Sequence, residues 1–75
     1  MTTLMWEVRA ADGRLGELVE FVAANADPSA QVYRSAQGEG RVVVIDPTGR
    51  GVSDVPPELL ARPAHAWPFE PVQRG

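Results

Sequence analysis

Apolar and polar positions alternate along residues 3–10, so that one side of this segment is uniformly apolar and the other is mixed. The apolar side carries Leu4, Trp6 and Val8. A period of two residues is typical of a β-strand whose two faces meet different surroundings. We therefore predict a first strand over residues 3–10.

A helical period follows this strand, because apolar residues then recur every three or four positions. They are Leu15, Leu18, Val19, Val22 and Ala26. On a helix these positions form a stripe about 100° wide, which is typical of a helix that packs against a sheet. The dipeptide Asp27-Pro28 is a suitable end for this helix.

Further strands and a second helix complete the predicted order. Residues 30–35 and 41–46 are expected to be strands joined by a glycine-containing turn. A short second helix is expected just before Pro63, and residues 64–72 are expected to form the last strand.

The predicted order is β-α-β-β-α-β, which is the ferredoxin-like arrangement of an α+β protein. In it, a four-stranded antiparallel sheet in the order 4-1-3-2 carries two helices on one face. The last strand contains Pro68 and Pro71 and suits an edge position, because proline removes a hydrogen-bond donor from the sheet. The strand at residues 41–46 holds four consecutive apolar residues and suits a central position.

That apolar run also predicts an assembly. Val42 and Val44 would point to one face of the sheet, and Val43 and Ile45 to the other. Two helices can cover only one face, so the second face is expected to be apolar without a cover from this chain. A second copy is the expected cover, which predicts a homodimer joined through the sheet face.

Composition narrows the expected partners and location. The chain of 75 residues has ten acidic and seven basic residues and a net charge of −3, and its arginines are scattered. The sequence has no basic stripe that would suit nucleic acid, so we expect no nucleic-acid partner. It also has no apolar run of membrane length and no signal-peptide layout, so we expect a cytoplasmic protein with one domain over residues 1–75. With no cysteine and one histidine, we expect no metal site and no cofactor.

Few residues are suited to chemistry. His65 is the only histidine, so any general-base mechanism near neutral pH would centre on it. The candidate catalytic residues are His65 and Tyr33, and the candidate ligand-binding residues are Trp67, Phe69, Glu7 and Arg9. Structural roles are the alternatives: a half-exposed strand histidine, aromatic residues at an interface, and an ion pair or exposed rim for the two charged residues.

With this order of elements, residues 3–72 resemble the dimeric α+β-barrel superfamily, which includes the antibiotic-biosynthesis-monooxygenase-like proteins. The resemblance is one of architecture, and it implies two ferredoxin-like subunits packed sheet against sheet. The segments WEVRA, VVVIDP and HAWPFEPV also look like those of short uncharacterised proteins from GC-rich bacteria.

Two functions are consistent with these features. The first is a non-catalytic homodimer that binds a small ligand or a partner protein. The second, implied by the superfamily resemblance, is a cofactor-free oxygenase, cyclase or isomerase that acts on an aromatic or polyketide-like molecule. The small number of catalytic groups favours the first.

Overall fold

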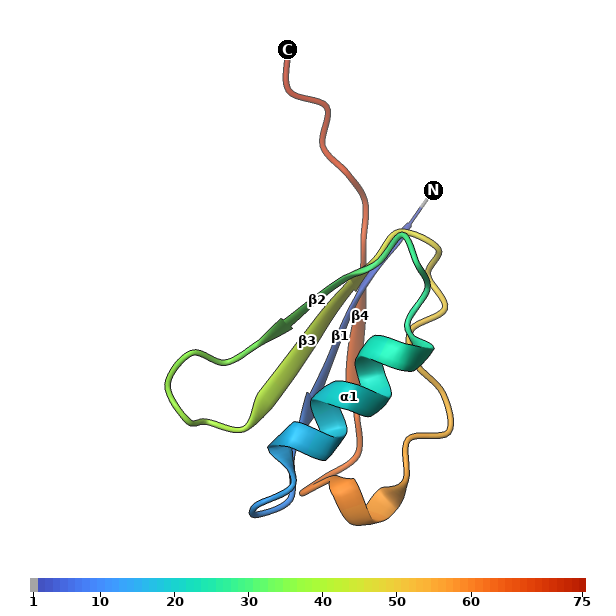
Figure 1. The fold of residues 1–75 in the computed structure, drawn as a ribbon. Coiled ribbons are helices and arrows are strands. Elements are labelled where there is room, and N and C mark those ends of the chain that lie inside the picture. Colours follow the sequence, from blue (N-terminus) through green and yellow to red (C-terminus); the bar gives the residue numbers. More distant parts are fainter. Residues whose placement is uncertain (1) are drawn as a thin grey trace.

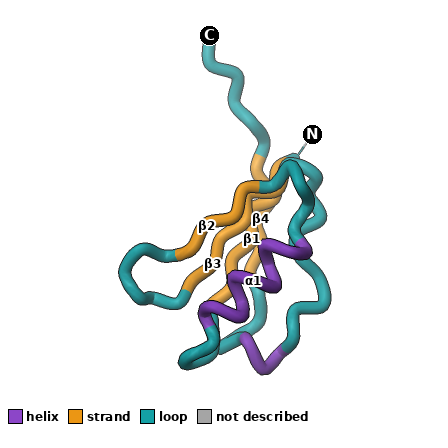
Figure 2. The backbone as a smooth tube through the Cα atoms, viewed as in Figure 1, coloured by secondary structure: helices purple, strands orange, loops and turns teal. Residues whose placement is uncertain are grey.

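The computed structural model describes residues 2–75 and shows a small α+β protein. Its elements, in chain order, are β1 (Thr3–Arg9), α1 (Leu15–Asn25), β2 (Gln31–Arg34), β3 (Arg41–Asp46), the 3₁₀ turn η1 (Pro57–Leu59) and β4 (His65–Phe69). The four strands form one sheet, and α1 and η1 lie on the same side of it (Figures 1 and 2). After β4 the chain extends away from the sheet as a tail (Figure 1).

The sheet has the order β2-β3-β1-β4, and all neighbouring strands are antiparallel. This confirms the predicted order, with β3 and β1 in the centre and the proline-containing β4 at an edge. The central pair runs in register from Leu4 opposite Asp46 to Arg9 opposite Arg41. On the other side of β1, Met5 pairs with Trp67 of β4.

The prediction of a second helix is wrong, because α1 is the one α-helix among residues 2–75. Pro57 and Pro63 enclose only five residues, and a helix this short gains too few hydrogen bonds to offset its nucleation. The chain instead leaves η1 at Leu60, which bridges Ala10, and the Ala61 N–H donates to the Arg9 carbonyl over 2.9 Å. The complete two-helix ferredoxin-like arrangement is therefore not observed.

The hydrophobic core lies between α1 and the sheet. It is formed by Trp6, Val8, Leu18, Val22, Val42, Val44, Val52 and Leu59. The apolar side predicted for β1 and the helical stripe predicted for α1 thus lie against this core, and β3 contributes one of its two apolar faces through Val42 and Val44. Gly51 brings the loop after β3 against this core: its φ is +70°, and a Cβ here would lie 3.0 Å from a methyl carbon of Leu4. A side chain at position 51 would therefore be strained by both its backbone angle and its neighbours.

No helix within residues 2–75 has both the length and the apolar character needed to cross a membrane.

Candidate functional site

The face of the sheet opposite α1 is the candidate functional site, and we call it the open face. Strand register places on it the residues that alternate with the core positions. They are Thr3, Met5, Glu7 and Arg9 of β1, Gln31 and Tyr33 of β2, Arg41, Val43 and Ile45 of β3, and His65, Trp67 and Phe69 of β4. Apart from Glu7, all of these side chains are half-buried or exposed. All six site residues predicted from the sequence lie on this one face.

One end of the open face is apolar, and we call it the apolar end: Met5, Ile45, Trp67 and Phe69. Met5 lies between Ile45 and Trp67 on neighbouring strands, and Phe69 pairs with Thr3 at the next outward position. Trp67 is 41% exposed and Phe69 is 53% exposed. Large apolar side chains gathered in this way on one surface are typical of an interaction site. The prediction that the second face of β3 is apolar is thus confirmed by the half-buried Val43 and Ile45.

The other end of the open face is charged, and we call it the arginine end: Arg9, Arg41 and Arg62 around Glu7. Glu7 is only 5% exposed. One of its carboxylate oxygens forms an ion pair with Arg41, and the other lies 3.6 Å from Nη2 of Arg62. Arg41 also lies 4.0 Å from Glu39. Glu7 is therefore satisfied within the chain by arginines that are distant in sequence, and among residues 2–75 no ion pair joins it to Arg9.

His65 and Tyr33 lie in one row across the open face but on opposite edge strands. His65 pairs with Glu7, Glu7 with Val43, and Val43 with Tyr33. Three strand spacings of about 4.8 Å separate the two candidate catalytic residues by about 14 Å. The structure therefore does not bring them together within one chain.

Each of these two side chains has a local partner instead. The rings of His65 and Trp67 meet edge to face with their centroids 5.9 Å apart. The Tyr33 hydroxyl donates to Oε1 of Gln31 over 3.1 Å. These contacts position the aromatic rings on the open face without forming a chain of proton transfer.

A small hollow of about 210 Å³ adjoins the arginine end, a feature that sequence reasoning missed. It is lined by Tyr33, Arg34, Ser35, Glu39, Arg41 and Val43. The Ser35 hydroxyl accepts a hydrogen bond from the Arg41 backbone N–H over 3.1 Å. The hollow thus joins guanidinium and hydroxyl groups to the aromatic and apolar residues of the open face.

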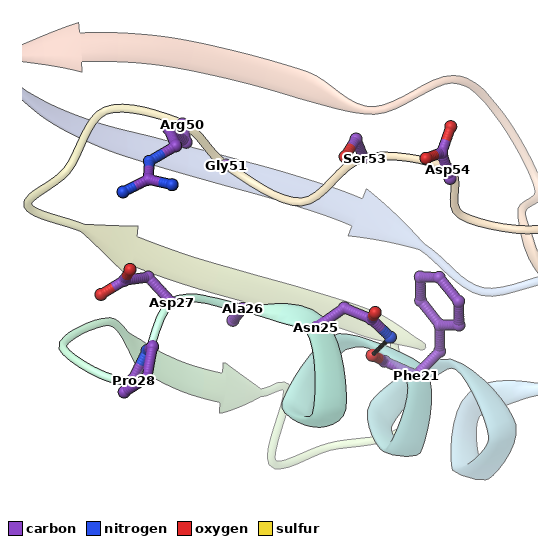
Figure 3. A pocket seen from close by; sticks show the side chains of 9 residues that line it. All are labelled: Phe21, Asn25, Ala26, Asp27, Pro28, Arg50, Gly51, Ser53 and Asp54. Atoms are coloured by element: carbon purple, nitrogen blue, oxygen red, sulfur yellow. Dashed lines mark hydrogen bonds between the residues drawn. The ribbon is translucent and has the colours of Figure 1, made fainter.

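A larger hollow of about 570 Å³ lies on the other side of the molecule, between α1 and the loop after β3 (Figure 3). Figure 3 shows Arg50 and Asp27 at one end of it and Phe21 and Asp54 at the other. The hydroxyl and backbone N–H of Ser29 donate to Asp27 and hold the pKa of its carboxyl below the usual value, and the charge of Arg50 adds to this effect. Sequence reasoning missed this hollow because it forms between the end of α1 and a loop that is distant from it in sequence.

The buried carboxylate of Asp46 organises that loop. It accepts hydrogen bonds from the backbone N–H and the hydroxyl of Thr48, over 2.8 and 2.6 Å, and from the N–H of Gly51 over 2.8 Å. Burial alone would raise the pKa of Asp46, but these hydrogen bonds outweigh it, so the pKa lies below the usual value. Asp46 is therefore an ionised structural group at neutral pH.

Comparisons with protein-family models, with curated proteins and with solved structures found no match to this chain. In the part of the chain that the structure describes, no group of three or more metal-ligating side chains is placed to hold a metal ion. All six predicted site residues lie on the open face, so its two ends are the basis for a proposed function.

Proposed function

We propose that the protein is a homodimeric binding module in which the apolar end of one copy packs against the apolar end of a second. The observation that carries this proposal is the row of Met5, Ile45 and Trp67, extended by Phe69, on a sheet face that α1 does not cover. Removing apolar surface from water is favourable by about 25 cal/mol for each Å². A twofold axis presents the same patch from both copies, so one apolar end is matched by another.

The size of the chain also supports self-association. A chain of this length buries only about 60% of the surface that it exposes when unfolded. Small proteins of this kind usually gain stability from disulfides, metals or a second subunit. Disulfides are excluded here by the absence of cysteine. The resemblance to proteins whose subunits pack sheet against sheet agrees with this choice of interface.

Charge favours one orientation of the two copies. A twofold axis parallel to the strands would stack the arginine ends on each other, with Arg9 and Arg41 of one copy facing the same arginines of the other. An axis that crosses the strands at the level of Met5 keeps the apolar ends together and sends the arginine ends in opposite directions. Because unpaired like charges repel strongly when buried, we propose the second arrangement.

This orientation also bears on the alternative enzyme function. An oxygenase, cyclase or isomerase site built from His65 and Tyr33 needs the His65 side chain of one copy to lie over Tyr33 of the other. Only the axis parallel to the strands produces that overlap, and it also stacks the arginine ends. The proposed orientation therefore favours binding over catalysis. Unchanged turnover of an aromatic substrate by the His65→Ala and Tyr33→Phe variants would exclude that site.

The dimer is tested by light scattering at micromolar concentration. We expect a mass of twice the 8.1 kDa of the chain. Val43→Asp places a carboxylate within the open face and is expected to give a monomer of lower stability. Val72→Asp makes the same chemical change in the exposed tail and is expected to remain a dimer. A wild-type protein that is folded and monomeric throughout this range would overturn the proposal.

A further inference from the structure

The arginine end carries more positive charge than its carboxylates balance. Arg41 and Arg62 pair with the buried carboxylate of Glu7, Arg9 lies two residues along β1 from it, and Glu39 approaches only Arg41, at 4.0 Å. The excess is local, because the chain as a whole has a net charge of −3. A concentration of positive charge on an acidic protein favours an anionic partner at that place.

Of the three arginines at this end, Arg9 has the least compensation from carboxylates. It lies directly opposite Arg41 on the neighbouring strand, an arrangement that is unfavourable for like charges. Among residues 2–75, no carboxylate lies within 4.0 Å of its guanidinium nitrogens. Nε of Arg9 and Nε of Arg41 are both buried without a hydrogen-bond partner in the described structure. Buried donors are almost always paired in proteins, so an added acceptor is favoured at these two Nε–H groups, while the terminal nitrogens of Arg41 already face Glu7 and Glu39.

The adjoining hollow indicates the shape of that acceptor. Its volume of about 210 Å³ is smaller than the usual range for ligand sites, which begins near 300 Å³. Its wall includes the ring of Tyr33 and the side chain of Val43, beside the guanidinium of Arg41, and it also includes Arg34 and the carboxylate of Glu39. Arg9 does not line the hollow but lies next to it, opposite Arg41 on the neighbouring strand. The Ser35 hydroxyl oxygen accepts from the Arg41 backbone, which leaves the hydroxyl proton available for a second acceptor.

We propose that the arginine end binds a small organic acid with a single ring or a short branched chain. Its carboxylate would lie between Arg9 and Arg41, because the planar guanidinium group matches a carboxylate with two parallel hydrogen bonds. Its apolar part would lie against Val43 and Tyr33.

This anion site adds a ligand class to the binding role proposed above. It rests on the proposed dimer in one respect, because the dimer places the site at its periphery. Arg9 and Arg41 lie four residues along the strands from Met5 and Ile45, which at about 3.3 Å for each residue is about 13 Å. The proposed twofold axis therefore leaves the arginine end accessible. All the residues of the site come from one copy, so the site does not need the second copy in order to form.

The test is a titration of ¹⁵N-labelled protein with benzoate at neutral pH, followed through the arginine Nε–H resonances. We expect saturable shifts of the Arg9 and Arg41 signals with benzoate, and none with benzamide, which has the same ring without the charge. Arg9→Gln is expected to weaken benzoate binding at least tenfold. Arg50→Gln, which removes an exposed arginine from the other side of the molecule, is expected to leave it unchanged.

Three results would overturn this proposal. They are equal shifts with benzamide, no shift at millimolar benzoate, or equally tight binding of inorganic phosphate, since phosphate cannot use the apolar wall. The comparison of benzoate with benzamide needs no variant, so the test does not depend on the folding of Arg9→Gln. Light scattering on the same samples separates this proposal from the dimer. A monomer that binds benzoate would refute only the dimer, and a dimer that does not bind it would refute only the anion site.

Discussion

Asp46 is the group through which the loop after β3 is held to the sheet, and Asp46→Asn changes its charge with little change in shape. An asparagine can still accept from Thr48, but its amide nitrogen then faces the N–H of Gly51, which donates to Asp46 over 2.8 Å. One hydrogen bond to a charged group is lost, at about 1.5–3 kcal/mol, and a buried donor is left unpaired. We expect Asp46→Asn to lower the free energy of unfolding by about 3 kcal/mol.

Thermal unfolding measured by circular dichroism at one fixed protein concentration checks this value. For a protein of 60–100 residues, a loss of about 3 kcal/mol corresponds to a decrease in Tm of about 12–24 °C. Asp27→Asn is the matched control, because Asp27 also accepts from a backbone N–H and a hydroxyl two residues ahead, but outside the core. We expect a much smaller decrease for this control. Equal decreases in the two variants would refute the role assigned to the burial of Asp46.

The same carboxylate predicts a dependence of stability on pH. The pKa of Asp46 is lower in the folded protein than its unfolded value of about 3.9. As pH falls, the unfolded chain therefore takes up a proton on Asp46 before the folded protein does. The stabilisation by the ionised carboxylate is present above the unfolded pKa and is lost as pH falls through the folded pKa. Urea unfolding between pH 7 and pH 2.5 should show a steeper loss of stability below about pH 4 for wild type than for Asp46→Asn. Parallel curves would contradict this assignment.

Two further substitutions test the packing of the loop and the arginine end. In urea unfolding, Gly51→Ala should destabilise the protein by about 1–3 kcal/mol, because the φ of residue 51 is +70° and the added Cβ would approach Leu4. The control is Gly16→Ala, on the exposed side of α1, where the added Cβ has no atom within 4 Å and the change should be neutral or stabilising. In the same assay, Glu7→Gln should lower the free energy of unfolding by about 1–2 kcal/mol, because Arg41 and Arg62 lose their shared carboxylate while remaining partly solvated. A variant as stable as wild type would contradict the pairing.

The strands and their order could be predicted from local patterns because each pattern had one consistent solution. Four consecutive apolar residues in β3 suit only a central strand with two apolar faces, and this same run predicted the open face. Pro68 similarly required an edge position for β4. These signals are local in sequence, and their structural consequences were recovered correctly.

The features that were missed depend on contacts between distant segments. The second helix did not form because Pro57 and Pro63 leave too few residues for it, and Leu60 instead bridges Ala10, a tertiary contact that a short helical pattern does not reveal. Glu7 pairs with Arg41 and Arg62 rather than with the nearby Arg9, and this choice follows from strand register. Register also places His65 and Tyr33 on the same face but on opposite edge strands, which the sequence pattern does not reveal.

The two edge strands of the sheet disfavour the addition of further copies of the chain by strand pairing. β2 has only four residues, and β4 carries Pro68, which has no N–H to offer to an incoming strand. Strand-by-strand addition, which builds fibrils, is therefore disfavoured at both edges. In the proposed dimer, contact through one self-complementary face is exhausted once two copies have met, so a finite particle is expected rather than a filament.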